Sequence, residues 1–361
     1  MGPENKFRPK FRTTLRDRTG TLTSRYTVSM QSVTIVATVL NEVGDIERLV
    51  TSLLAQEPPA NEVIVVDGGS TDGTWERLVA LQAKDERLAP IRDESCNLKN
   101  SPGPIARGRN VAITAAKSSV IACADAGCRY APDWLGNLVA PLLSGKAEYA
   151  LGGSCVDSEI CTVWDVAAAP FFGIRLAADA PIKSCTARSM AFTKSFWEKI
   201  GGFPEHVLLG EDTLFDLEAR KQTTPAFISK AKALYAPQFT LQSAVEKMGR
   251  YAACDGQARV RWSRLVRNAE RCIVELAALA LLPWSILPLL AVLVFELWVA
   301  FRFDWKDLVR YGLAAIAARF IFSLALPWIV TVNHIRGLFS KKPLINPQNE
   351  IATAEKGSMR I

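Results

Sequence analysis

The sequence predicts an α/β fold, in which a mostly parallel β-sheet carries helices on both faces and apolar helices follow near the C-terminus. Two observations predict it. In the first half of the chain, β-branched apolar runs alternate with segments whose apolar residues recur at helical spacing, the order typical of parallel strands joined by crossover helices. In the second half, two long runs are almost wholly apolar.

The expected strands are short and continuously apolar, which favours burial on both faces of the sheet. They cover Val33–Val39 (VTIVATV), Glu62–Asp67 (EVIVVD) and Ser119–Asp125 (SVIACAD), with a further strand within Ala147–Asp157. Three helices are expected between the first strands, over residues 44–56, 72–84 and 104–117. Asp72 is a plausible N-cap of the second, and Pro104 opens the third. Later helices are expected from Ser195, stopped by two glycines, and from Glu211.

Polar side chains lie where these strands end. Asn41, Asp67 and Asp125 stand at or just past the carboxyl ends of three expected strands. Ligands of such sheets bind outside the carboxyl ends of the strands. The sequence therefore predicts a binding site at this edge.

The two apolar runs, Ile273–Phe301 and Tyr311–Val332, are each near or beyond the roughly 20 residues that cross a bilayer core. Prolines and charged residues interrupt them: Glu275, Pro283, Pro288, Glu296 and Arg319. Two spans are predicted, and an interfacial or re-entrant segment is the alternative.

Charge and cysteine usage restrict the partners. The net charge of +7 suits a protein at a membrane surface, and the basic first 27 residues, which have no apolar secretory segment, predict a disordered tail or one attracted to anionic lipid. No recognised nucleic-acid motif accompanies the basic residues, so nucleic acid is not an expected partner. Eight cysteines without a C-x-x-C pair, and only two histidines, argue against a zinc site and for a reducing compartment.

Five motifs stand in one order along the chain: TVLNE (38–42), VVDGGSTDGT (65–74), GRNVAI (108–113), DAGCRYAPDWL (125–135) and GGFPE with GED (201–205 and 210–212). Together they resemble the family 2 glycosyltransferases, inverting enzymes of the GT-A fold that use nucleotide-diphospho sugars. The resemblance covers about Val33–Trp262, two thirds of the chain. QARVRW (257–262) is similar to the Q-x-x-R-W motif of processive synthases, but it is one residue too long and favours a basic membrane-proximal helix.

The resemblance implies a role for each matching residue. Thr38 to Glu42 would line the base and ribose, Asp67 would accept from a base N–H of uracil or guanine, and Arg109 would lie near the diphosphate. The glycine-rich turn after Asp67 would let the backbone approach the nucleotide. The implied nucleotide-binding residues are Thr38, Leu40, Asn41, Glu42, Asp67, Gly69, Ser70, Arg109 and Ala124. Asp125 would be the metal ligand, and Asp212, with Glu211 beside it, the catalytic base.

The chemistry of the reaction agrees with these roles. A leaving nucleoside diphosphate gains negative charge, which a divalent cation or fixed cationic groups stabilise. The acceptor hydroxyl loses a proton as it attacks the anomeric carbon, and a single carboxylate can take that proton. Inversion needs only this base, so the expected reaction is a one-step displacement.

One residue departs from the family pattern. Gly127 stands where the second acid of the D-x-D metal motif is expected. Three consequences are open: Mg²⁺ or Mn²⁺ held by Asp125, diphosphate and waters; a shell completed by Asp157 or Glu211; or charge supplied by Arg109, Lys183 or Arg188. A weakened metal site with Mg²⁺ or Mn²⁺ is the prediction.

The expected organisation is a basic tail (1–31), a GT-A domain (32–270), two transmembrane or membrane-embedded helices (271–335) and a polar tail (336–361). The predicted function is transfer of a sugar from a UDP- or GDP-sugar to a lipid-linked or membrane-proximal saccharide acceptor. The catalytic domain is expected on the cytoplasmic side of an inner or plasma membrane. The alternative is an inactive relative that acts as a membrane-associated nucleotide-sugar-binding module. A nucleotidyltransferase is disfavoured because no glycine- and lysine-rich phosphate signature is present.

Overall fold

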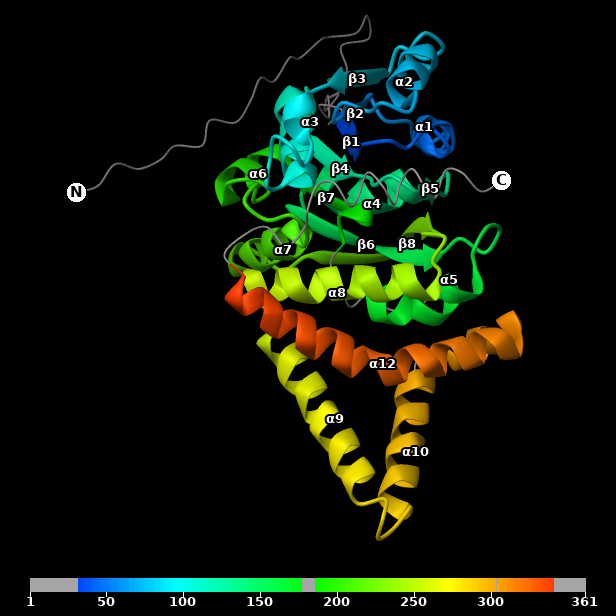
Figure 1. The fold of residues 1–361 in the computed structure, drawn as a ribbon. Helices are drawn as coiled ribbons and strands as arrows, with labels where there is room; N and C mark the ends of the chain where they lie inside the picture. The colour runs from blue at the N-terminus through cyan, green and yellow to red at the C-terminus, as the bar shows by residue number, and fades with distance from the viewer. Residues whose placement is uncertain (1–31, 177–185, 303, 341–361) are drawn as a thin grey trace, which may run out of the picture. The chain divides into compact units, whose positions relative to one another are not determined.

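The computed structural model describes residues 32–176, 186–302 and 304–340, and its centre is one eight-stranded mixed sheet (Figure 1). The strand order is β3-β2-β1-β4-β7-β6-β8-β5. The strands are β1 Val33–Val39, β2 Glu62–Asp67, β3 Leu88–Arg92, β4 Val120–Cys123, β5 Cys128–Tyr130, β6 Tyr149–Val156, β7 Met190–Thr193 and β8 Ala226–Tyr235. β1 and β2 coincide with the predicted strands, so the predicted α/β fold is confirmed.

The sheet has a parallel half and a mixed half. β3, β2, β1 and β4 run parallel, as predicted. β7 is antiparallel to both β4 and β6, β8 runs parallel to β6, and β5 closes the sheet antiparallel to β8. Four strands, β3, β5, β7 and β8, were not predicted from the sequence.

Helices cover both faces of the sheet and bury two separate hydrophobic clusters. They are α1 Ile46–Leu54, α2 Thr74–Gln82, α3 Pro104–Ala115, α4 Trp134–Leu143, α6 Lys194–Ile200 and α7 Glu211–Gln222. Two more helices, α5 Val163–Ala168 and α8 Leu241–Gln257, contribute to a third cluster. Residues of α1, α2 and α4 pack on one face, and residues of α3, α6 and α7 pack on the other.

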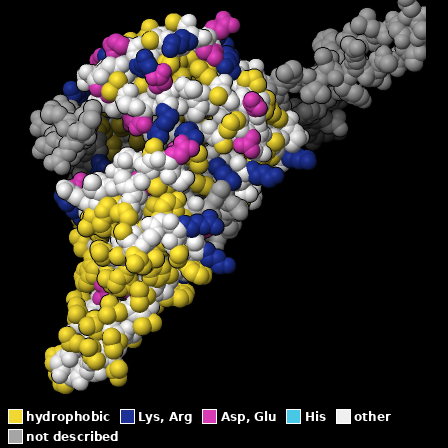
Figure 2. Space-filling model, turned by 90° about the vertical axis from the view of Figure 1, so that its right-hand side faces the viewer, with side chains coloured by type: hydrophobic (Ala, Val, Ile, Leu, Met, Phe, Trp, Pro, Cys, Tyr) yellow, Lys and Arg dark blue, Asp and Glu magenta, His cyan; other side chains and the backbone are white. Residues whose placement is uncertain are grey.

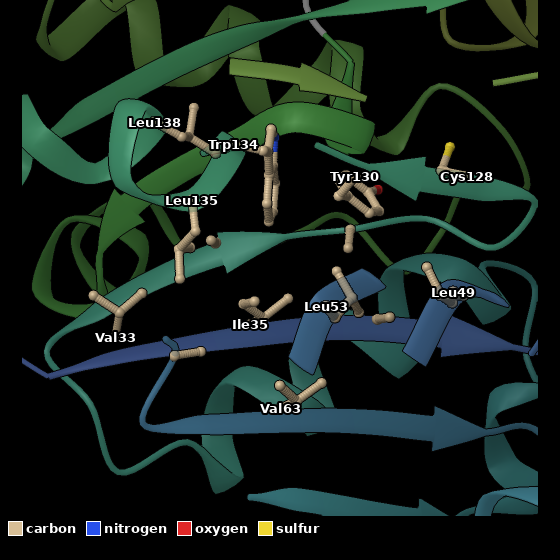
Figure 3. Packing of buried hydrophobic residues seen from close by; sticks show 14 of the residues in the cluster. Val33, Ile35, Leu49, Leu53, Val63, Cys128, Tyr130, Trp134, Leu135 and Leu138 are labelled. Carbon is tan, nitrogen blue, oxygen red and sulfur yellow. The ribbon is translucent and has the colours of Figure 1, made fainter. Parts of the chain in front are cut away.

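Successive strand residues point into opposite clusters, as continuous apolar strands require. Ile35 and Val63 belong to the first cluster, with Leu53 of α1 and Trp134 of α4 (Figure 3). Val36, the neighbour of Ile35, belongs to the second. This two-sided burial fixes the strand register, and with it the positions of the residues that follow each strand.

The first apolar run forms a helical hairpin and not one helix (Figure 1). Its arms are α9 (Trp262–Ala280) and α10 (Leu287–Phe301). Pro283 lies in the connection, where its missing N–H and fixed φ prevent a continuous helix, and Pro288 stands in the first turn of α10, where proline is tolerated. The structure thus differs here from the predicted transmembrane span.

The second apolar run forms α12 (Gly312–Phe339), which follows the short α11 (Trp305–Leu308). Within the described residues, Trp305–Phe339 is the one helical segment long and apolar enough to cross a membrane, with a mean hydropathy of 2.0, and 44% of its apolar window is buried inside the protein. Phe322 and Val330 of α12 share a core with Met248 of α8. Length and composition would permit a membrane anchor, while the packing ties α12 to the rest of the domain.

The charged residues that interrupt the apolar runs all have partners. Arg271 donates from Nε to Oε1 of Glu296 at 3.0 Å and from Nη2 to the carbonyl of Ser323 at 3.1 Å, which joins α9, α10 and α12. Arg319 donates to the carbonyl of Val166 at 2.7 Å. Because buried charges are tolerated only when paired, these contacts explain how the runs accommodate them.

Candidate active site

The loops that follow β1 and β2 are bonded to each other. Asn41 adopts a left-handed backbone conformation (φ 55°), its Oδ1 accepts from the N–H of Thr71 at 2.9 Å, and its own N–H donates to Oγ of Ser70 at 2.8 Å. The N–H of Glu42 donates to Oγ1 of Thr74 at 2.8 Å. The predicted nucleotide-lining residues of the two strands therefore form one rigid unit.

Asp67 is fully buried at the end of β2 and keeps one oxygen unused. Its Oδ1 accepts from the backbone N–H groups of Gly69 and Ser70, both at 2.8 Å. Its Oδ2 is buried and has no hydrogen-bond partner in the described part of the chain. Buried polar atoms are nearly always bonded, so an orphaned carboxylate oxygen here fits an N–H donor from a ligand.

The other strand-end residues differ in their access. Leu40 is exposed and Thr38 is half-buried. A Cβ on Gly108 would stand 2.4 Å from Oγ1 of Thr38, so the glycine of GRNVAI is what lets α3 lie against β1. Ala124 is fully buried in the first cluster and donates its N–H to the carbonyl of Val36 at 2.9 Å, so its side chain is not available to a nucleotide.

The carboxyl group of Glu42 is a weaker acid than an ordinary glutamate. Burial, and then the charges of Asp45 and Asp72, raise the pKa of Glu42 to about 7. Near neutral pH this carboxyl is therefore partly protonated and can donate a hydrogen bond as well as accept one.

Arg109 connects Asp125 to the start of α7. Its guanidinium, 2% exposed, lies 2.5 Å through Nη2 from Oδ1 of Asp125 and forms a second ion pair through Nη1 with Glu211. The same group lies over the ring of Phe203, 5.4 Å from its centroid. Arg109 therefore lies behind Asp125 and holds β4, α7 and the GGFPE loop together.

The two acids of the GED motif have different surroundings. Glu211 is buried against Arg109, and burial raises the pKa of Glu211, with Arg109 opposing the rise and Asp212 adding to it. Asp212 is only half-buried, and it accepts from its neighbour's N–H (Thr213, 2.6 Å) and from the N–H of Ala187 at 3.3 Å. Asp212 is thus the more accessible of the two carboxylates.

The GGFPE loop is held by Asn110, whose role was missed from the sequence. Asn110 donates to the carbonyl of Phe203 at 2.9 Å and accepts from the N–H of Phe203 at 3.0 Å. It also donates to Glu205 at 2.8 Å. Since this loop precedes α7, the asparagine of GRNVAI helps to place the GED acids.

Tyr130 and Arg188 contact Asp125, and Tyr235 and Lys247 extend this cluster beyond Arg188. Arg188, in the 3₁₀ turn η3 (Ala187–Ser189), has Nε 4.0 Å from Oδ2 of Asp125 and its guanidinium 4.5 Å from the ring centroid of Tyr235. Lys247 donates to the hydroxyl of Tyr235 at 2.8 Å. Tyr130 accepts from the N–H of Asp125 at 2.9 Å and donates to the carbonyl of Arg188 at 3.0 Å. The sequence indicated Arg188 as a candidate, but it indicated no role for Tyr130, which lies within DAGCRYAPDWL, or for Tyr235 and Lys247, which lie in no motif.

The carboxylates that could complete a metal shell are already engaged. Asp157 pairs with Arg129 at 3.0 Å and Arg48 at 3.8 Å, and Glu211 pairs with Arg109. Within residues 32–176, 186–302 and 304–340, no three His, Cys, Asp or Glu side chains gather as metal ligands do. The donors that are present therefore do not fit a protein-made divalent-cation site. Asp125 stays a predicted ligand, and Lys183 lies outside the described residues.

Comparisons with known proteins bear on the family and on the fold. Residues 34–196 match the family described as Glycosyl transferase family 2, a stretch that runs from β1 into α6 and ends before GGFPE and GED. Among solved structures, the chain is similar in fold to the mannosyltransferase PcManGT from Pyrobaculum calidifontis in complex with GDP-Man and Mn²⁺, at 19% identity and a TM-score of 0.52, over 86% of this chain and 88% of that one. GalNAc-T7 with UDP, GalNAc and Mn²⁺ matches at 17% identity and a TM-score of 0.43, over 59% of this chain and 44% of that one. No curated protein matches the chain.

Proposed function

Residues 34–196 belong to glycosyl transferase family 2, and from this premise we propose that the protein is an inverting glycosyltransferase. It moves a sugar from a UDP- or GDP-sugar to a lipid-linked or membrane-proximal saccharide acceptor. Asp212 is the general base, and Glu211 is a positioning residue that acts through Arg109. The nucleotide lies along Thr38, Leu40, Asn41, Glu42, Asp67, Gly69, Ser70 and the backbone of Ala124.

The observation that carries this proposal is the chain of contacts from Asp125 through Arg109 to Glu211 and Asp212. It joins the carboxyl edge of the parallel strands to the first turn of α7. A carboxylate beside this edge can contact the hydroxyl of an acceptor that lies next to a nucleotide sugar bound there. A candidate general base is judged first by whether it lies within hydrogen-bond distance of the proton it removes, and only then by its pKa.

The reaction follows from this placement. The acceptor hydroxyl gives its proton to Asp212 as its oxygen attacks the anomeric carbon. The bond from that carbon to the diphosphate oxygen breaks, and its electron pair leaves with the nucleoside diphosphate. Attack from the face opposite the leaving group inverts the anomeric centre. No step here rests on the predicted Mg²⁺ or Mn²⁺, because the described donors do not fit such a site.

A second candidate function is a nucleotide-sugar-binding module without turnover. Gly127 favours it, since the second acid of the usual motif is missing. The accessible Asp212 favours the enzyme, because a binding module needs no base in that position.

Asp67→Asn tests the nucleotide site. The new amide places a donor, not an acceptor, where Oδ2 has no partner, so we expect UDP or GDP to bind roughly 10- to 150-fold more weakly, the cost of about 1.5–3 kcal/mol for one unmade charge-assisted hydrogen bond. Binding is measured by calorimetry on the full chain in detergent, and turnover is measured with a panel of UDP- and GDP-sugars that includes GDP-mannose.

Asp93→Asn is the control, because the side chain of that aspartate accepts from the N–H of Ser95 in the loop after β3, and the substitution leaves its backbone bond to the carbonyl of Asp67 in place. Nucleotide binding that Asp67→Asn leaves unchanged would contradict the site. Tight binding without turnover of any donor, across a range of lipid acceptors, would favour the binding module.

We also propose that the α9–α10 hairpin attaches the protein to a membrane, with both flanks on the cytoplasmic side. Its large apolar side chains face outward: Trp284 is 80% exposed and Leu287 70% exposed. Figure 2 has hydrophobic side chains gathered over this projection. An apolar surface of this extent is typical of a membrane or protein interaction site.

The hairpin accounts for a charge pattern that two spans leave unexplained. Arg264 and Arg267 lie in the first half of α9, and Arg302, Lys306 and Arg310 follow α10. A single span over this run would place these two basic groups on opposite sides, whereas a hairpin returns the chain to the side it left. With 15 residues, α10 is only about 22 Å long, short of the ~30 Å bilayer core.

Trp284→Glu with Leu287→Glu should release the protein from membranes. Charges at the tip cost on the order of 2–3 kcal/mol each within hydrocarbon, so flotation with vesicles of anionic phospholipid should fall at least about tenfold. Leu217→Glu is the control, because Leu217 is also an exposed apolar residue, at 45%, but lies on α7. Undiminished flotation of the double variant would assign the attachment to α12.

A further inference from the structure

We propose that Arg188 and Lys247, both in contact with the ring of Tyr235, bind the donor's diphosphate in place of a divalent cation held by two carboxylates. This inference rests on the proposed function, because it concerns how the same site holds a nucleoside diphosphate. It replaces the sequence-based prediction of a weakened metal site with a site in which side-chain cations carry the charge.

Asp125 is poorly placed to hold a metal ion. Its Oδ1 lies 2.5 Å from Nη2 of Arg109, and its Oδ2 faces Nε of Arg188 at 4.0 Å. A divalent cation approaching either oxygen would meet a guanidinium group at short range, and like charges this close repel strongly in a partly buried site. The carboxylate instead fixes the two arginines.

A ring takes the space beside the missing second acid. A Cβ on Gly127 would lie 3.5 Å from Cε2 of Tyr235. The sheet sets this contact, because β5 pairs with β8 and places Cys128, the next residue, opposite Tyr235. The position that usually supplies a metal ligand therefore faces an aromatic side chain.

Two cations converge on that ring from different elements. Arg188 comes from η3, with its guanidinium 4.5 Å from the ring centroid, and Lys247 comes from α8, with Nζ 5.5 Å from the centroid. Lys247 also donates to the tyrosine hydroxyl at 2.8 Å. Tyr235 thus orders both cations, and cation–π contact stabilises them without neutralising them.

The carboxylates near this cluster do not balance the positive charges of Arg188 and Lys247. Arg109 has two close carboxylates. The side chain of Arg188 is 11% exposed, and its one ion pair, with Asp125, is long at 4.0 Å. Lys247 forms no ion pair with any of the described residues. Cations removed from water without close carboxylates are costly unless a ligand pairs with them, and a diphosphate offers several charged oxygens to do so.

The cluster also borders the predicted nucleotide site. The positive charge of Lys247 opposes the rise in the pKa of Glu42, so the lysine acts on a residue that follows β1. On the other side of the cluster, Asp125 follows β4, which is the strand next to β1 in the sheet. A nucleotide held at Asp67 and Glu42 would extend its phosphates toward this cluster.

The test compares nucleoside diphosphates with nucleosides by calorimetry on the full chain in detergent. UDP, GDP, uridine and guanosine are titrated in EDTA, in Mg²⁺ and in Mn²⁺. We expect the affinity of wild type for the diphosphate to agree within about threefold in all three conditions. Arg188→Gln and Lys247→Gln should each weaken the diphosphate roughly 10- to 100-fold, as the loss of a charge-assisted hydrogen bond predicts, and leave nucleoside affinity unchanged.

Two further variants sharpen the result. Arg220 also lies over an aromatic ring, 5.5 Å from the centroid of Phe227, but outside the cluster, so Arg220→Gln should bind like wild type. Gly127→Asp supplies the second acid at a left-handed position (φ 69°) that aspartate tolerates, and Mn²⁺ should then strengthen diphosphate binding. An unaltered melting temperature, together with retained nucleoside binding, verifies that each variant is folded.

The inference and the proposed function fail in different ways. Diphosphate binding by wild type that EDTA abolishes and Mg²⁺ or Mn²⁺ restores, with Arg188→Gln and Lys247→Gln near wild type, would overturn the inference and leave the enzyme intact. Absence of binding by wild type to every nucleotide and nucleoside, in all conditions, would overturn the proposed function itself.

Discussion

Asp212→Asn is expected to lower kcat for sugar transfer by about 10²- to 10⁴-fold, the usual contribution of a general base. The amide has nearly the same size, and its single oxygen can still accept from the N–H of Thr213, as Oδ1 of the aspartate does. Its NH₂ group takes the place of Oδ2, so the long 3.3 Å bond from the N–H of Ala187 is lost. What the amide cannot do is take the proton of the acceptor hydroxyl. Affinity for the donor nucleotide should therefore remain within about twofold, so that the loss lies in the chemical step.

The two neighbouring acids provide a direct contrast. Glu211→Gln should act through position, because it weakens the ion pair with Arg109, and should reduce kcat less and stability more than Asp212→Asn does. Glu218→Gln, on the same helix and paired with Lys221 at the surface, is the matched control and should leave both unchanged. If Asp212→Asn kept kcat within a few fold of wild type while Glu211→Gln abolished it, the roles of the two acids would be exchanged.

The parallel half of the sheet was predictable because its signals are local. Continuous apolar runs define β1 and β2, and the polar residues Asn41 and Asp67 follow at once, so the sequence alone is enough to predict the edge where they meet. The unpredicted strands lack such runs. β3 is an edge strand that contains Pro90, and β8 is partly exposed and contains Lys230 and Lys232. The composition of these two segments therefore does not predict a strand.

The candidate site was predictable in its motifs but not in its contacts. The cluster around Asp125 brings together Arg109, Arg188 and Lys247, which come from three separate elements of the chain. Only the antiparallel pairing of β5 with β8 places Tyr235 beside Gly127, and no sequence pattern carries that information. The hairpin was ambiguous for another reason, since an apolar run with a central proline is compatible both with a kinked span and with two arms.

Arg109→Met is expected to destabilise the fold by about 3–5 kcal/mol, the cost of removing one partner from a buried ion pair. Methionine fills much of the same volume, so the main effect is that Asp125 and the buried Glu211 lose their shared cation. Arg109→Lys keeps the charge but lacks the planar fork that reaches both carboxylates, and it should recover only part of the loss. Chemical denaturation of the full chain in detergent, which compares midpoints at constant slope, measures the difference.

A double-mutant comparison separates lost charge pairing from lost packing. In Arg109→Met with Glu211→Gln, the uncompensated buried carboxylate is gone, so the double variant should be more stable than the sum of the two single effects predicts. Arg87→Met is the control: its pair with Asp85, 2.6 Å apart and partly exposed, should contribute no more than about 1 kcal/mol. Equal losses for Arg109→Met and Arg87→Met would mean that Arg109 does not link Asp125 to α7, and the physical connection between the strand edge and the proposed base would be lost with it.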